Sequence, residues 1–144
     1  MNADNLERWE NGSDFSWEYY QDKDIIKNQL FDKSLILGTG RCALKLLISW
    51  GISQNNWNRI WIPTYFCPEV IESILSTGLR IEFYLDDPIN TFNLDEIDYK
   101  IGDVILVNNL FGYRTQPLYD SLPRNRIQII EDHSHDPWSD WSLN

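Results

Sequence analysis

The chain has 144 residues, of which 42% are hydrophobic and 24% charged, a size and composition typical of one soluble globular domain. Twelve Lys and Arg side chains against 22 Asp and Glu give a net charge of −10, which argues against nucleic-acid binding and against an anionic membrane surface as a partner. No stretch approaches the roughly 20 apolar residues of a membrane span. The acidic N-terminus does not resemble a signal peptide, and we expect Cys42 and Cys67 to be reduced thiols in a cytoplasmic protein.

The chain divides into two parts by its pattern of residues. Residues 1–18 are polar and rich in turn formers, and residues 19–31 carry apolar side chains at rough helical spacing. We therefore expect an N-terminal arm and helix over residues 1–33. The regular pattern of a folded domain covers residues 34–144.

Short apolar runs in this second part alternate with segments of helical spacing. The runs predict strands at residues 34–37, 59–62, 80–85, 103–108 and 126–130. Alternating strands and helices favour an α/β fold with three layers, in which a mostly parallel sheet lies between helices.

The segments between the strands predict helices with recognisable ends. Helical spacing from Ala43 to Trp50 ends at Gly51, which suits a helix C-cap. A second helix begins near Pro68 and ends before Gly78. We also expect a short helix at residues 93–99, one or two helical turns at residues 116–122, and packing roles for Trp50, Trp57 and Trp61.

Glycine, aromatic and amide residues follow three of the predicted strands, where open α/β sheets bind ligands. Gly38, Gly40 and Arg41 open a helix whose free amides would attract phosphate, although such glycine turns are also common as purely structural turns. The turn matches neither the dinucleotide pattern nor the Walker pattern. The other candidates each have a structural alternative: Tyr65 and Phe66 stack on a planar ring or belong to the core, and Asn109 reaches a ligand or satisfies a turn.

The densest polar cluster, Glu131–Asp136, follows the last predicted strand. A carboxylate at this position can pair with a protonated ring nitrogen. A metal site formed by His133 and His135 with Asp132 or Asp136 is a competing interpretation, because imidazole and carboxylate suit zinc. With no second cluster of ligands we expect no metal. A hydrolase triad has less support, since no nucleophile elbow is present.

Taken in order, these segments resemble the first half of the DegT-type sugar aminotransferases, a family of the fold-type I pyridoxal-phosphate superfamily. The resemblance covers about residues 34–138. It rests on four motifs in sequence: GTGRCAL, WIPTYFCPEVIESILSTG, DVILVNNLFGY and IIEDHSHD. It implies the large-domain half of the pyridoxal-phosphate transferase fold, apparently incomplete.

The resemblance also implies roles for individual residues around pyridoxal 5'-phosphate. Gly40, Arg41 and Cys42 stand where backbone amides hold the cofactor phosphate. Tyr65 or Phe66 stands near the residue that stacks on the pyridine ring. The remaining positions are Asp132 at the pyridinium nitrogen, Ser134 on the other ring face, His135 directly after it, and Asn109 on the pocket floor.

The chain departs from the family at the catalytic lysine. Family members carry their Schiff-base lysine well beyond the Glu-Asp motif, whereas the lysines here are Lys23, Lys27, Lys33, Lys45 and Lys100. We therefore expect no catalytic residue in this chain and no transamination by the chain alone. The complete enzyme of the family would act on an amino donor and a keto-sugar. The resemblance further implies a homodimer or a complementing chain. The alternatives are a non-catalytic remnant and an accessory or unrelated α/β domain that binds a small molecule.

Overall fold

The computed structural model describes residues 35, 37–86, 94–112, 114, 122 and 127–136. All of them except residue 35 belong to the compact unit Ile36–Asn144. The arm and helix expected within residues 1–33 lie outside the described residues. So do residues 116–121 of the helical turns expected at 116–122.

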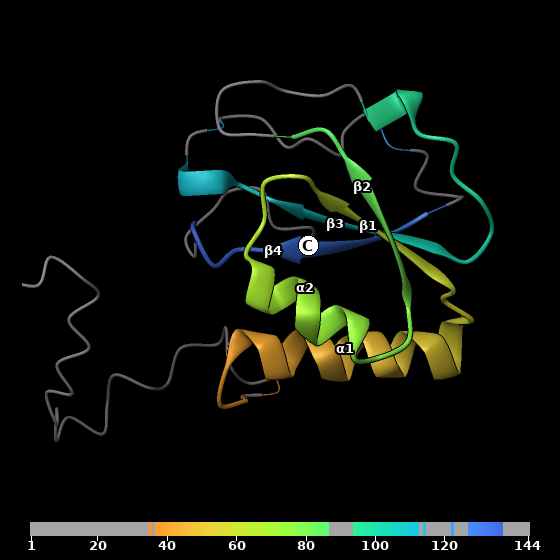
Figure 1. The fold of residues 1–144 in the computed structure, drawn as a ribbon, viewed down its shortest axis with the longest axis horizontal. Helices are drawn as coiled ribbons and strands as arrows, with labels where there is room; N and C mark the ends of the chain where they lie inside the picture. The colour runs from red at the N-terminus through yellow and green to blue at the C-terminus, as the bar shows by residue number, and fades with distance from the viewer. Residues whose placement is uncertain are drawn as a thin grey trace, which may run out of the picture. The chain divides into compact units, whose positions relative to one another are not determined.

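The described residues form one sheet of four strands, all parallel (Figure 1). The order across the sheet is β2-β1-β3-β4, so the chain adds β2 on one side of β1 and β3 on the other. This confirms the expected α/β class and parallel sheet. The strands are β1 (Arg59–Pro63), β2 (Arg80–Tyr84), β3 (Asp103–Asn108) and β4 (Gln128–Asp132), each within two residues of its predicted bounds.

The expectation of a strand at residues 34–37 was wrong for the part of this range that the structure describes. Leu35 and Leu37, the two residues of that range within the description, lie in no strand and are exposed. An apolar run of four residues carries no periodicity of its own, and it becomes a strand only where a sheet edge pairs with it. The described pairings of β4 are all with β3.

Two helices, α1 (Gly40–Asn55) and α2 (Pro68–Leu75), lie on one face of the sheet (Figure 1). Ile48 of α1 and Ile74 of α2 are fully buried against the inward rows of the strands. On the opposite face the described residues form one 3-10 turn, η1 (Leu94–Glu96), and Leu94, Ile97, Tyr99 and Leu122 pack against the strands there. Of the three layers expected, the described residues show the sheet and one layer of helices. The helix expected at 93–99 is the short turn η1.

Helix α1 begins and ends at polar residues. Thr39 caps its start, since the Thr39 hydroxyl accepts a hydrogen bond from the Cys42 amide at 3.1 Å. Its end lies at Asn56, whose backbone is left-handed with φ 55°. The expectation that Gly51 is the C-cap was wrong, because Gly51 lies inside the helix, where the ring of Trp57 occupies the space that a side chain would take.

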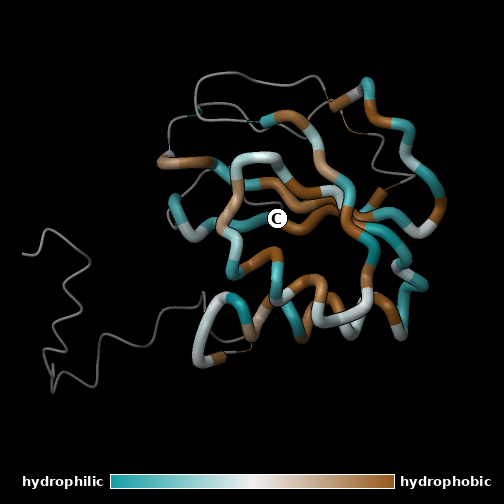
Figure 2. The backbone as a smooth tube through the Cα atoms, viewed as in Figure 1, coloured by the Kyte–Doolittle hydropathy of each residue, from teal (hydrophilic) through white to brown (hydrophobic). Residues whose placement is uncertain are grey.

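Hydrophobic residues gather in the central strands and recur along both helices (Figure 2). All six residues of β3 are buried, as expected for a strand with neighbours on both sides. Trp57 is buried and Trp61 is half-buried, but Trp50 is 51% exposed, so the packing role expected for Trp50 was wrong. Neither of the two described helices has both the length and the apolar character that a membrane crossing requires.

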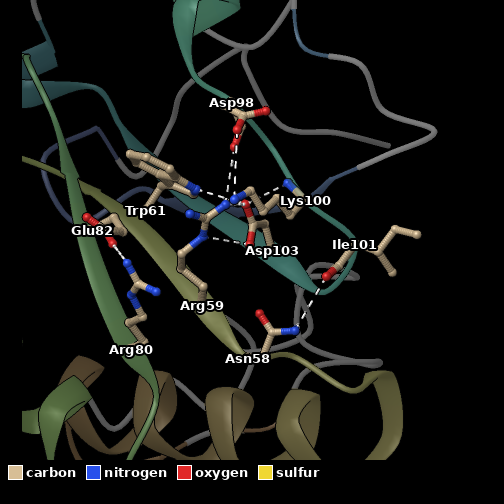
Figure 3. A network of polar contacts seen from close by, with 9 residues as sticks. All are labelled: Asn58, Arg59, Trp61, Arg80, Glu82, Asp98, Lys100, Ile101 and Asp103. Carbon is tan, nitrogen blue, oxygen red and sulfur yellow. Dashed lines mark hydrogen bonds and ion pairs between the residues drawn. The ribbon is translucent and has the colours of Figure 1, made fainter.

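A buried ion pair joins β1 to β3 at the amino ends of the strands (Figure 3). The guanidinium of Arg59 donates to both carboxylate oxygens of Asp103 and lies 4.8 Å from the centre of the Trp61 ring. Asp103 also accepts hydrogen bonds from the Trp61 indole at 3.1 Å and from the Lys100 amide at 2.9 Å. This network joins the strands at the end of the sheet opposite to their carboxyl ends.

Candidate functional site

The carboxyl ends of the parallel strands meet at one edge of the sheet, and a cleft of about 760 Å³ opens there beside α1 and α2. Its volume falls within the range of small-molecule sites. Residues from α1, α2, β3, β4 and the positions directly next to them line it: Thr39, Gly40, Arg41, Ala43, Leu44, Leu47, Cys67, Glu69, Val70, Leu106, Ile130, Glu131, Asp132, His133 and Ser134.

The first turn of α1 forms one side of this cleft. Helix geometry leaves the amides of Gly40 and Arg41 without acceptors inside the helix, while those of Cys42 and Ala43 donate to Thr39. A Cβ atom placed at Gly38 or Gly40 would meet nothing within 4 Å. Neither glycine has a positive φ, so neither backbone conformation nor crowding within the chain requires glycine there.

Arg41 places a positive charge at the same turn. Its guanidinium makes no ion pair with any described residue, although the charge of Arg41 helps to lower the pKa of Glu69. The larger cause of the lowered Glu69 pKa is the hydrogen bond that the Cys67 thiol donates to Glu69 at 2.8 Å. Cys42 is exposed and is not among the residues that line the cleft.

Asp132 at the end of β4 forms another side of the cleft. One of its carboxylate oxygens, Oδ1, accepts hydrogen bonds from the amide and the hydroxyl of Ser134. These bonds fix the orientation of the carboxylate. Within the described part of the chain, the other oxygen, Oδ2, makes no hydrogen bond.

The two histidines of the cluster after β4 have separate partners. The Nε2 atom of His133 lies 2.9 Å from Glu131, and both side chains line the cleft. His135 accepts a hydrogen bond at Nδ1 from the Phe111 amide at 3.1 Å. Across residues 37–86, 94–112 and 127–136, no three His, Cys, Asp or Glu side chains gather closely enough to hold a metal ion.

Tyr65 and Phe66 point to different surroundings. Phe66 is half-buried and packs against the core between the sheet and the helices. Tyr65 is 53% exposed and lies 6.5 Å from the ring of Phe111, which in turn lies 5.2 Å from the ring of His135. Tyr65, Phe111 and His135 therefore form an exposed aromatic group, and none of these three residues lines the cleft.

Asn109 is fixed by three hydrogen bonds. Its side-chain oxygen accepts from the Arg114 amide at 2.9 Å, and its nitrogen donates to the Arg114 carbonyl at 3.1 Å and to Asp136 at 2.9 Å. The guanidinium of Arg114 also pairs with the buried Asp86. The structure thus gives Asn109 a role in holding the loop after β3.

The structure adds residues to the cleft that the resemblance gave no role at the cofactor. Thr39 caps α1, while Cys67, Glu69 and His133 line the cleft beside the expected Gly40, Arg41, Asp132 and Ser134. Arg114 and Asp86 support the neighbouring loop, but they are 28 positions apart, so no local motif could have paired them. No family model, curated protein or solved structure matches this chain.

Proposed function

We propose that this chain is the cofactor-binding half of a pyridoxal-phosphate-dependent aminotransferase of the DegT type. The observation that carries the proposal is the charge pattern of the cleft, with helix amides and Arg41 on one side and the carboxylate of Asp132 on another. A ligand with an anionic group and a protonated ring nitrogen complements this pattern. When bound, pyridoxal phosphate supplies an electron sink for amino-group transfer.

The first turn of α1 would hold the phosphate. Its free amides carry the positive end of the helix dipole, and the Arg41 guanidinium adds a full charge that is suited to phosphate oxygens. The open space in front of Gly40 lets a phosphate approach the backbone closely. Glu69 and Glu131 make other parts of the rim acidic, so we expect the phosphate at this turn and nowhere else in the cleft.

Asp132 would hold the ring nitrogen in its protonated form. Its carboxylate is already oriented by Ser134, and Oδ2 remains available as an acceptor. Phe66 packs in the core, so Tyr65 is the better of the two candidates for a contact with the ring. We place that contact in the complete enzyme only, because Tyr65 lies outside the cleft.

Among the described residues, no amine lines the proposed half-site. The described lysines are Lys45 and Lys100, and neither lines the cleft. We infer that a lysine from outside this sequence, on a longer or a complementing chain, completes the site for an amino donor and a keto-sugar. Residues 127–130 at β4 support this inference, because they line a groove of about 440 Å³ with Leu47, Trp50, Asn55 and Trp57. Among the described residues β4 is paired on one side only, and an apolar groove beside such a strand is a place where a further element can pack.

The test is a titration of the purified chain with pyridoxal phosphate and, separately, with pyridoxal. Tryptophan fluorescence reports the binding of each ligand. We expect pyridoxal phosphate to bind at least tenfold more tightly than pyridoxal, because only the phosphorylated form reaches the α1 amides and Arg41. Arg41→Ala should reduce this preference, and Asp132→Asn should weaken both ligands. Arg80→Ala is the matched control, because the exposed side chain of Arg80 pairs with Glu82 on β2 and lies outside the cleft.

Equal affinities for the two ligands in the wild-type protein would contradict the proposal. Borohydride reduction of the complex, followed by mass spectrometry, separates the half-site from a complete enzyme. We expect no reduced adduct on any of the five lysines of this chain. A stoichiometric adduct on any of them, together with amino-transfer turnover, would show that the chain is an enzyme by itself.

A non-catalytic domain that binds a small molecule is the second candidate. It is favoured by the absence of any lysine among the described residues that line the cleft. In that case the preference for a phosphorylated ligand would persist with other phosphate esters. If ribose 5-phosphate bound to the cleft as tightly as pyridoxal phosphate does, the result would point to this second function.

A further inference from the structure

Asn108, at the end of β3, carries a buried polar atom with no partner. Only 5% of the residue is exposed, and its side-chain oxygen has no hydrogen bond. Outside the sheet pairing, its backbone carbonyl accepts a hydrogen bond from the Arg114 guanidinium at 3.1 Å. Any residue at position 108 could make that bond, so the carboxamide has no structural task among the described residues.

The orientation of the amide does not remove the problem. Exchanging the oxygen and nitrogen positions would leave a buried donor without an acceptor in place of a buried acceptor without a donor. A buried polar group that has given up its hydrogen bonds to water destabilises the fold unless another group satisfies it. An aliphatic residue would suit this position in the sheet better.

Strand geometry places Asn108 beside the cleft. Side chains alternate along a strand, so Asn108 lies on the same face as Leu106. In register on β4, Asn108 is paired with Asp132 and Leu106 is paired with Ile130. Leu106, Ile130 and Asp132 all line the cleft. Asn108 does not itself line it, but it lies next to them and carries the one buried oxygen of these four residues that has no hydrogen bond.

The neighbouring asparagine gives the contrast. Asn109 lies directly after the end of β3, and its side chain makes three hydrogen bonds that fix the following loop. The two adjacent amides therefore have different roles. One is occupied by protein, and the other is available at the strand end next to Asp132.

We propose that Asn108 is a ligand-binding residue whose carboxamide hydrogen-bonds the polar edge of the ring held at Asp132. The inference rests on the proposed function, since the probe is pyridoxal phosphate. The second side-chain torsion of asparagine is broad, so the amide can turn toward the cleft without a change in the backbone. The ligand would then satisfy an atom that is unsatisfied in the free protein.

The experiment compares Asn108→Val with Asn108→Thr, two variants of nearly equal shape that differ in one hydroxyl group. In the absence of ligand, Val should give the higher urea midpoint, because it buries no polar atom. With pyridoxal phosphate, Val should weaken binding about tenfold relative to wild type, and Thr should recover part of that loss. The ratio of pyridoxal phosphate to pyridoxal affinity should stay at its wild-type value in both variants, because Asn108 would contact the ring and not the phosphate.

Equal ligand affinity for wild type, Val and Thr would overturn the role of Asn108 while leaving the proposed cofactor in place. Failure of the wild-type protein to bind pyridoxal phosphate would overturn both. If the variants do not fold, the side-chain amide resonances of Asn108 in the wild-type protein provide the readout. They should shift on saturation with pyridoxal phosphate, and unchanged resonances would overturn the inference.

Discussion

The ring of Trp57 lies directly against the backbone of Gly51, so closely that a Cβ atom at Gly51 would come within 2.1 Å of the ring. The contact folds the chain back at the end of α1, where the Trp57 indole also donates a hydrogen bond to Gln128 of β4. Glycine is needed here for close approach and not for an unusual backbone angle, because Gly51 is helical.

Replacing Gly51 by alanine should therefore destabilise the fold. At an open helical site the same change stabilises by up to about 1 kcal/mol, but here the methyl group overpacks against a buried ring, which costs about 1–3 kcal/mol. Urea unfolding followed by tryptophan fluorescence measures the difference. A gain in stability for Gly51→Ala would show that the Trp57 ring can move aside freely.

Replacing Gly40 by alanine, in contrast, should not destabilise the fold. A Cβ atom there meets no protein atom within 4 Å, so we expect no loss of stability. The affinity for pyridoxal phosphate should fall severalfold, because the methyl group would stand where the phosphate approaches the amides of α1. Calorimetric titration against wild type checks this, and an unchanged affinity would argue against the phosphate position.

The ion pair of Arg59 and Asp103 should make the fold sensitive to acid. Burial alone would raise the pKa of Asp103, but hydrogen bonds from Arg59, the Lys100 amide and Trp61 outweigh burial and lower it. A lowered pKa in the folded state gives stability that is present above the unfolded value of about 3.9 and is lost as the pH falls through the folded value.

Asp103→Asn should lose about 3 kcal/mol near neutral pH, because Arg59 would remain buried without its counter-charge. Its stability should then decline less steeply than that of wild type between pH 5 and 3. Urea midpoints across this range provide the measurement. Asp98→Asn is the control, because the Asp98 side chain is 89% exposed and its ion pair with Lys100 is long at 3.9 Å. Parallel profiles of stability against pH for wild type and Asp103→Asn would contradict the role of Asp103.

Tyr84 should contribute to alkaline sensitivity. Burial raises the pKa of Tyr84 well above its usual value of about 10, and its hydroxyl donates to the Leu106 carbonyl at 2.9 Å. The raised pKa means that stability is present below pH 10 and is lost as the pH rises, since the unfolded chain ionises first.

Tyr84→Phe should cost about 1 kcal/mol at neutral pH and should reduce the further loss above pH 10. Unfolding by urea at pH 8 to 11 measures both effects. Tyr65→Phe is the control, because the Tyr65 ring is 53% exposed. A Tyr84→Phe profile that runs parallel to wild type above pH 10 would exclude Tyr84 as the source.

The sheet could be predicted because its signal is local. Runs such as Arg59–Pro63 and Asp103–Asn108 are apolar, and turn formers bound them. Gly51 could not be interpreted correctly, because its role depends on a ring that packs back onto the helix. The sequence could not predict that Tyr65 is exposed and that Phe66 packs in the core, because both residues lie beyond Pro63, where strand alternation no longer applies. Asn108 and Asn109 are identical and adjacent, and only the register of β3 against β4 separates their surroundings.

The order of the strands also has a consequence for the time course of folding. β1 can pair with β2 after α2 has formed, but the contact of Arg59 with Asp103 joins residues 44 positions apart. Closing so long a loop is entropically unfavourable, and parallel pairings of this kind form slowly. We expect β1 and β2 to associate early and β3 to enter between β1 and β4 late. Once inserted, the fully buried amides of β3 should be the slowest in the sheet to exchange with deuterium.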